Sequence, residues 1–168
     1  MSLWLIAAGV ICMRLGVLKE PEGETRVAIV PKSLRKLTKS GFEVTIESNA
    51  GLSANHHDSE YEENGAVVST RSEVLKSPLL ITINLPEISE LHSGQVIACV
   101  ADPFRHPEKV QACLDAGVTL LSMDMIPRRL SRAQSMDVNS SQDNLAGYKA
   151  VLLGAASVPK GIPMMTTS

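Results

Sequence analysis

The chain has 168 residues, of which 44% are hydrophobic, 20% are charged and only 3% are aromatic. This length and composition are typical of one globular domain with an aliphatic core. Sixteen basic and eighteen acidic residues give a net charge of -2. That balance argues against general nucleic-acid binding, which requires a basic face that displaces counterions from phosphates.

The first twelve residues form a segment of their own. Leu3 to Cys12 is an apolar run that is too short to span a bilayer and lacks the basic residues that precede a secretory core. Because Met13 opens a more natural beginning, residues 1–12 are interpreted as an extension or upstream start. An extra strand or packed segment is the second interpretation of these residues, and a membrane anchor is the third. The odd cysteine count, without metal-type spacing, indicates a reducing, cytoplasmic compartment.

From Met13 onward, short apolar runs alternate with amphipathic stretches. Strands are predicted at 14–18, 42–46, 66–68, 79–84, 95–101 and 118–122. Helices are predicted from Pro31 to a cap at Gly41, and at 59–64, 71–76, 107–117 and 142–157. This order predicts a three-layer α/β fold, flavodoxin-like or Rossmann-like, with a mainly parallel sheet and helices on both faces.

Several helix positions are predicted to face the core or to cap a helix. The inward positions are Leu34 and Leu37 in the first helix, then Val110, Cys113 and Leu114 in the fourth. Leu145, Tyr148, Val151, Leu152 and Ala155 fall along one face of the last helix, which Ser140, Ser141 or Asp143 could cap. One domain is therefore expected over residues 13–157, followed by a linker at 158–168.

The segment RRLSRAQSMD, residues 128–137, is the most unusual part of the chain. It lies between the last predicted strand and the last predicted helix, where open α/β sheets bind ligands. Its arginines can hold a phosphate or carboxylate through paired hydrogen bonds, and Gln134 and Asp137 can recognise an amide or hydroxyl edge. The alternative is a solvated connecting loop, and spacing alone leaves both interpretations open.

Two longer stretches resemble a known family. MDMIPRRLSRAQSMDVNSSQDNLAGYKAV resembles the signature of the NAD(H)-binding α subunit of proton-translocating NAD(P) transhydrogenase, a family similar in turn to alanine dehydrogenase. MRLGVLKEPEGETRVAIVPKSLRKLTKSGFEVTIESNAG is similar to the amino-terminal signature of the same family. The resemblance runs from Met13 to the end of the chain.

The resemblance assigns roles to four residues of the loop and the helix behind it. It implies that Arg129, Gln134 and Asp137 hold the nicotinamide end of NAD(H) against NADP(H) on a partner subunit. A serine matching Ser140 helps to bind the carboxamide. The implied chemistry is direct hydride transfer between two nicotinamide rings, so the task of the protein is positioning rather than acid–base catalysis.

Other positions bear on a rival amino-acid dehydrogenase activity. In alanine dehydrogenases, the arginine matching Arg26 holds the substrate carboxylate; the alternative here is a structural ion pair with Glu24 or Glu60. Thr82 stands where those enzymes are expected to carry a catalytic lysine, and His106 is a poor match for their active-site histidine. Both departures count against amino-acid dehydrogenation. No histidine has partners at metal-ligand spacing, so no metal site is predicted.

The chain lacks the glycine-rich loop of dinucleotide-binding domains. Among its eleven glycines no two are separated by a single residue, so G-x-G-x-x-G does not occur. In the family, that loop belongs to a second domain that begins just after the segment matched by residues 163–165. The resemblance therefore implies a truncated, split or fragmentary α subunit that needs a Rossmann NAD-binding domain.

The resemblance also implies partners, a location and two rival functions. The partners would be the membrane and NADP-binding subunits of the transhydrogenase and a second copy in a homodimer. The location would be cytoplasmic, peripheral to the membrane through those partners. An alanine dehydrogenase-like fragment and a non-catalytic binding or assembly remnant of the same fold remain as alternatives.

Overall fold

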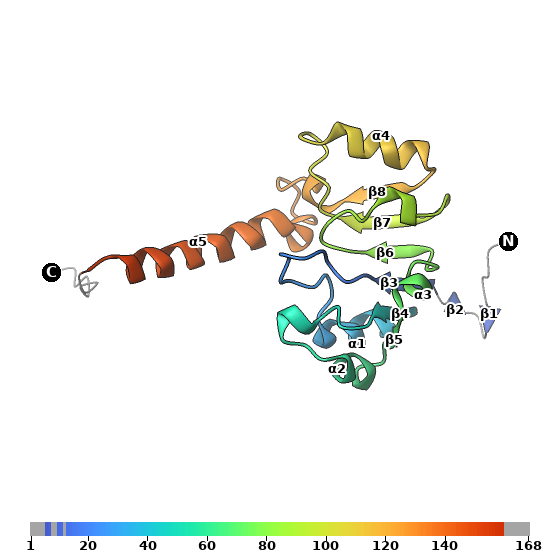
Figure 1. Ribbon diagram of the computed structural model, residues 1–168. Coiled ribbons are helices and arrows are strands. Elements are labelled where there is room, and N and C mark those ends of the chain that lie inside the picture. Colours follow the sequence, from blue (N-terminus) through green and yellow to red (C-terminus); the bar gives the residue numbers. More distant parts are fainter. Residues whose placement is uncertain (1–5, 8–9, 12, 160–168) are drawn as a thin grey trace. The chain divides into compact units, whose positions relative to one another are not determined.

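The structure is a computed structural model that describes residues 6–7, 10–11 and 13–159 (Figure 1). The chain divides into two compact units, Met1–Met125 and Ile126–Ser168. The first unit holds the sheet and its helices, and the second holds the segment 128–137 and the last long helix. Among the described residues, no helix is both long and apolar enough to cross a membrane.

A six-stranded sheet forms the centre of the first unit, and every neighbouring pair of its strands is parallel. Its strands are β3 (Met13–Val17), β4 (Phe42–Glu47), β5 (Val67–Ser69), β6 (Leu79–Ile81), β7 (Val96–Cys99) and β8 (Thr119–Ser122). They lie in the order β5-β4-β3-β6-β7-β8 (Figure 1). This is the Rossmann order, whose direction reverses between β3 and β6. The structure thus confirms the parallel α/β class and selects the Rossmann-like arrangement.

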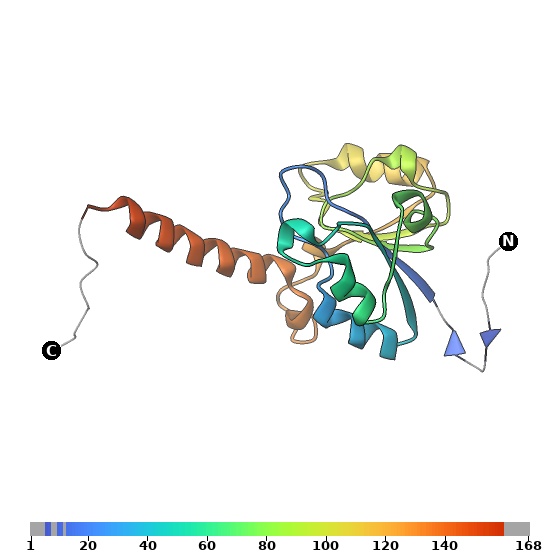
Figure 2. The ribbon, with the colours of Figure 1, turned by 60° about the horizontal axis from the view of Figure 1, so that its bottom comes forward.

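Helices cover both faces of this sheet, as predicted (Figure 2). The α-helices are α1 (Pro31–Lys39), α2 (Asp58–Glu63), α3 (Arg71–Val74) and α4 (Pro107–Asp115); short 3-10 turns are η1 (Leu52–Ala54), η2 (Ile88–Glu90) and η3 (Met123–Met125). α1 and α2 bury Leu34 and Tyr61 against one face, while α3 and α4 bury Val74 and Cys113 against the other. The two hydrophobic clusters therefore lie on opposite sides of the sheet.

Strand periodicity explains how one sheet serves two cores. In β6, Leu80 belongs to the cluster under α3 and α4, whereas Leu79 and Ile81 pack on the cluster under α1 and α2. Cys99 and Cys113 are each 1% exposed, and burial raises the pKa of both thiols. They act as small core hydrophobes, as their apolar sequence context predicts.

Two sequence predictions about local structure need correction. β6 ends at Ile81 rather than 84, because the backbone N–H groups of Ile83 and Asn84 donate to the Glu20 carboxylate. In α4 only Cys113 is buried; Val110 is 38% exposed and Leu114 69% exposed. The apolar spacing correctly predicted a helix, but fewer of its apolar side chains are buried against the sheet than the spacing indicated.

The amino-terminal segment forms a small sheet of its own. β1 (Ile6–Ala7) and β2 (Val10–Ile11) pair antiparallel and are separate from the six-stranded sheet. That residues 1–12 are an extension or upstream start stays a prediction. Cys12 and most of the predicted linker, residues 160–168, lie outside the described residues.

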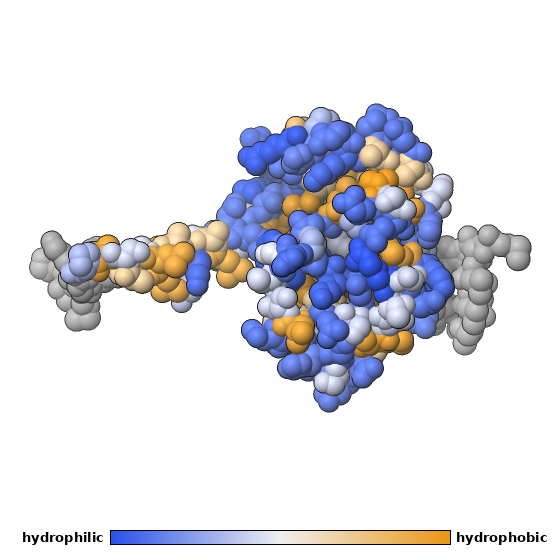
Figure 3. Space-filling view, viewed as in Figure 1, coloured by the Kyte–Doolittle hydropathy of each residue, from blue (hydrophilic) through white to orange (hydrophobic). Residues whose placement is uncertain are grey.

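The second unit consists of a loop with a 3-10 turn, η4 (Gln134–Met136), and the helix α5 (Val138–Ser157). The helix begins four residues before the predicted position, because Asp137 caps it rather than one of the residues proposed from sequence. Its large apolar side chains are exposed, by 48% to 69% for Leu145, Tyr148, Val151, Leu152 and Leu153. Figure 3 shows hydrophobic side chains along this helix.

Candidate functional site

Two of the four loop residues assigned by the resemblance interact directly. The Asp137 carboxylate accepts a hydrogen bond from the Ser140 backbone N–H at 2.9 Å and another from the Ser140 hydroxyl at 2.5 Å. The first satisfies a backbone donor that has no partner within the helix, as an N-cap side chain does. The cap therefore fixes the separation of two side chains that are predicted to bind the same ligand.

The Asp137 carboxylate is held in its charged form. Both hydrogen bonds from Ser140, followed by the charge of Arg128, lower its pKa below the ordinary value. An ionised carboxylate only accepts hydrogen bonds, so it suits a ligand that presents hydroxyl or amide N–H donors. The recognition role expected from the sequence stays a prediction.

The other two predicted residues lie on the surface of the same loop. Gln134 begins η4, three residues before the cap, and its side chain is exposed. Arg129 is exposed as well. The structure thus joins Asp137 to Ser140 and leaves Arg129 and Gln134 facing solvent, where each can reach a ligand.

Arg128 is a functional candidate that the sequence alone did not single out. Its Nε lies 3.8 Å from Asp137 Oδ1, and its Nη2 donates to Asp143 Oδ2 at 3.4 Å. One guanidinium thus bridges the cap and the second turn of α5. In the sequence, Asp137 and Asp143 follow an arginine-rich loop at a spacing that could have indicated this bridge.

Arg26 belongs to the first unit and forms the ion pair that was the alternative to substrate binding. Its guanidinium donates to both carboxylate oxygens of Glu24, from Nε at 2.8 Å and from Nη2 at 2.6 Å. This hydrogen-bonded pair lowers the pKa of Glu24 from 4.5 to about 2. Glu60, the other partner considered, instead accepts from the backbone N–H of His57 and contacts His56.

We expect Arg26→Ala to lower the free energy of unfolding at pH 7 by about 1 kcal/mol, because Arg26 is half exposed and solvent screens the pair. A carboxyl group with a depressed folded pKa stabilises the fold above its unfolded pKa and loses that effect as pH falls. The difference from wild type should therefore shrink between pH 4.5 and pH 2. Urea unfolding at pH 7 and pH 3 measures it, with the exposed Arg35→Ala as control. An equal loss at both pH values would exclude the pair as the cause.

Three carboxylates join the loops at the carboxyl ends of neighbouring strands. Glu47, at the end of β4, accepts from the backbone N–H of Lys19 at 2.8 Å. Glu20, after β3, accepts from the backbone N–H groups of Ile83 and Asn84 at 2.6 and 3.0 Å. Asp124, after β8, accepts from the backbone N–H of Asp102 at 3.0 Å. These contacts fix the ligand-binding edge of an open α/β sheet, and no pattern in the sequence indicated them.

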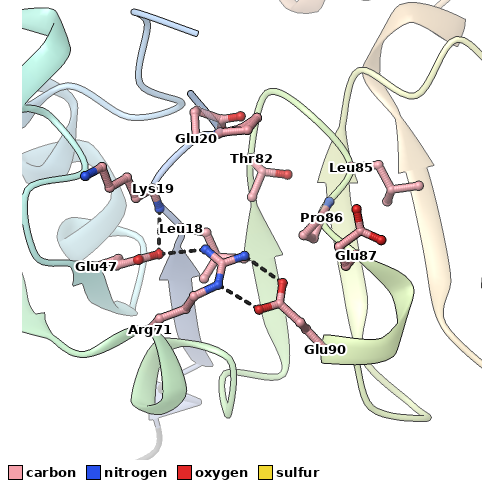
Figure 4. Close-up of a pocket in the computed structure, with 11 residues that line it drawn as sticks. Leu18, Lys19, Glu20, Glu47, Arg71, Thr82, Leu85, Pro86, Glu87 and Glu90 are labelled. Carbon is pink, nitrogen blue, oxygen red and sulfur yellow. Dashed lines mark hydrogen bonds and ion pairs between the residues drawn. The ribbon is translucent and has the colours of Figure 1, made fainter. Parts of the chain in front are cut away.

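A cavity of about 310 Å³ lies at the point where the strand order reverses (Figure 4). Leu18 and Thr82, from the carboxyl ends of β3 and β6, line it together with Arg71. The Arg71 guanidinium donates to Glu90 at 2.7 and 2.8 Å and to Glu47 at 3.0 Å. Because two carboxylates already occupy this guanidinium, the cavity is not arranged to hold an anionic ligand.

The two positions that departed from the alanine dehydrogenase pattern lie in different surroundings. Thr82 is 6% exposed, and its hydroxyl oxygen has no hydrogen-bond partner among the described residues. His106 precedes α4, and its Nδ1 lies 3.0 Å from Glu108 Oε1. Within the described part of the chain, no group of three or more His, Cys, Asp or Glu side chains is placed to hold a metal.

Comparison with known proteins identifies the family of this chain. The family model for the alanine dehydrogenase/PNT N-terminal domain matches residues 16–146. The chain belongs to this family. Its matched region includes the whole six-stranded sheet except the first residues of β3, as well as the loop with Arg129, Gln134 and Asp137.

Individual family members agree with this assignment. NAD(P) transhydrogenase subunit alpha from Haemophilus influenzae is 35% identical over 147 residues, covering 85% of this chain and 28% of the relative. Alanine dehydrogenase 1 from Staphylococcus aureus is 31% identical over 147 residues, covering 85% and 38%. The crystal structure of transhydrogenase from Sinorhizobium meliloti superimposes with a TM-score of 0.85 at 39% identity, covering 92% and 48%. The chain spans less than half the length of each.

Proposed function

We propose that this chain is the amino-terminal portion of a proton-translocating NAD(P) transhydrogenase α subunit and contributes to NAD(H) binding and hydride transfer to or from NADP(H). In this role Arg129, Gln134 and Asp137 hold the nicotinamide end of NAD(H), and Ser140 contributes to binding the carboxamide. The observation that carries the proposal is the hydrogen-bonded pair of Asp137 and Ser140 at the start of α5. Family membership supports it.

The chemistry requires orientation rather than a nucleophile or a base. Hydride transfer occurs directly between two nicotinamide rings, so the protein accelerates it by holding both rings at reacting distance. The residues of this chain would fix one ring through a charged carboxylate acceptor and exposed side chains of the same loop. NADP(H) would be held by a separate subunit.

Several partners complete this proposal. A Rossmann NAD-binding domain would grip the pyrophosphate, because this chain contains no G-x-G-x-x-G loop. The exposed apolar residues of α5 support a covering partner, since a helix is stabilised mainly by packing its apolar surface. Transhydrogenase membrane and NADP-binding subunits, and a second copy of the α subunit, are the remaining partners. The location would be cytoplasmic, peripheral to the membrane through these subunits.

A calorimetric titration with NADH tests this function on the purified chain. We expect saturable but weak binding, because the pyrophosphate site belongs to the proposed second domain, and at least a tenfold loss of affinity in Asp137→Ala. Asp115→Ala, which removes a carboxylate from the end of α4, is the control and should bind as wild type. Binding that is absent at millimolar NADH, or equal in all three proteins, would contradict the proposed site.

Turnover provides an independent check. The chain alone should not catalyse transhydrogenation, since the pyrophosphate site is proposed to lie on the Rossmann NAD-binding domain and the NADP(H) site on a separate subunit. Measurable hydride exchange between NADH and an NADP⁺ analogue by this chain would disprove the assignment as an incomplete unit. NADH formation from alanine after addition of a Rossmann NAD-binding domain would instead favour the amino-acid dehydrogenase alternative.

A further inference from the structure

Arg128 connects two carboxylates within the second unit. Its guanidinium lies 3.8 Å from Asp137 through Nε and 3.4 Å from Asp143 through Nη2. Asp143 is 74% exposed, whereas the side chain of Asp137 is only 9% exposed. The guanidinium therefore reaches from an exposed carboxylate on α5 to the more shielded one that caps the helix.

The surroundings of Asp137 are otherwise made of hydrogen-bond donors. Ser140 donates from its backbone N–H and its hydroxyl, and the backbone N–H of Asn139 also stabilises the carboxylate. Arg128 is the charged group that acts on it directly, with Asp143 on the far side of the guanidinium. Removing Arg128 would leave the cap hydrogen bonds in place but would remove the positive charge beside the carboxylate.

We propose that Arg128 is a positioning residue for the nicotinamide site, holding the Asp137 carboxylate in the orientation that a ligand meets. The inference rests on the function proposed above, because it assigns a role within the same site. Arg128 would contact no ligand atom. Its guanidinium can contact two carboxylates at once, which a lysine ammonium does with less geometric control.

The other arginines of the loop differ from Arg128 in their contacts. Arg129, assigned to the ligand, and Arg132 both have exposed side chains, and neither forms an ion pair among the residues that the structure describes. Arg128 is thus committed to internal contacts while Arg129 is available to NAD(H). Arg132 carries the same charge in the same loop and provides a matched control.

The test compares Arg128→Gln, Arg128→Lys and Arg132→Gln in titrations with NADH at pH 7 and with acid-stable NAD⁺ between about pH 3 and pH 7, because the ordinary pKa of this carboxyl group is 3.8. We expect Arg128→Gln to weaken NADH binding about two- to fivefold at pH 7, the effect of one exposed ion pair. Loss of that positive charge raises the pKa of Asp137 toward its ordinary value, so acid should weaken binding at a higher pH than in wild type. Arg128→Lys should restore part of the affinity, and Arg132→Gln should leave the pH profile unchanged.

Two results would overturn the inference while wild type still binds NADH through Asp137. One is the same loss and the same pH profile in Arg128→Gln and Arg132→Gln, which would indicate general electrostatic attraction. The other is wild-type binding by Arg128→Gln. A carboxyl-carbon NMR titration of Asp137 separates the two proposals, because it needs no ligand. An unchanged Asp137 pKa in Arg128→Gln refutes the positioning role, whereas a raised pKa with no NADH binding by wild type refutes only the proposed function.

Discussion

Gly16→Ala is expected to lower the free energy of unfolding by about 3 kcal/mol, the upper part of the range for overpacked cores. Gly16 lies in β3, between Thr45 of β4 and Leu80 of β6. A Cβ atom at this position would lie 2.8 Å from the backbone carbonyl oxygen of Val74 and 2.8 Å from a methyl carbon of Leu80. The backbone oxygen cannot rotate away as a side chain can, so α3 must move off the sheet.

Chemical denaturation of both proteins measures the loss, and Gly147→Ala is the matched control. Gly147 lies within α5, where a new Cβ meets no atom within 4 Å. Alanine is favoured over glycine inside a helix by about 1 kcal/mol, so this variant should be as stable as wild type or more stable. A loss below about 1 kcal/mol for Gly16→Ala would show that α3 yields easily and that its close approach to β3 is not needed.

Glu20→Ala should cost about 3 kcal/mol, because it removes one charged acceptor from several donors at once. Glu20 is 8% exposed and accepts from the backbone N–H groups of Ile83 and Asn84 and from the Asn84 side-chain amide. Hydrogen bonds to a charged group contribute about 1.5 to 3 kcal/mol each, and the donors would be left unsatisfied in a partly buried loop. The same change frees the loop after β6 at the point where the strand order reverses.

Two comparison variants isolate this effect. Glu22→Ala removes an exposed carboxylate two residues away and should change stability by less than about 0.5 kcal/mol. Glu20→Gln keeps one acceptor oxygen but turns an amide N–H₂ toward the other donor, so it should recover only part of the loss. Amide hydrogen exchange at Ile83 and Asn84 should become faster in Glu20→Ala. Unchanged exchange there would mean that other contacts hold the loop.

The apolar patterns of the sequence were sufficient for the order of elements. Continuous apolar runs mark β6 and β7 because strands covered on both faces bury nearly every side chain. Pro31 and Gly41 mark the ends of α1: proline fits the first helical turn, and Gly41 takes a positive φ of 88° just after the last turn. Such rules depend on local backbone geometry, so they need no knowledge of the rest of the fold.

Patterns were less reliable where a helix has only a narrow contact with the sheet. Val110 and Leu114 have helical spacing with Cys113, but only Cys113 is buried. The apolar residues of α5 are also spaced along a helix and are exposed in this chain. Periodicity shows which side chains share a face; whether that face is covered depends on what packs against it.

The fold class, the order of strands and helices along the chain, and the loop that carries Arg129, Gln134 and Asp137 were predicted without coordinates, because they depend on local periodicity and on a contiguous motif. Three contacts became known from the three-dimensional arrangement: Arg26 pairs with Glu24, Glu20 joins the loops after β3 and β6, and Asp137 rather than a later residue caps α5. In each case the sequence offers several charged residues that could form the contact, and nothing in their spacing distinguishes them. Such a choice depends on the distance and direction between side chains, which the sequence does not contain.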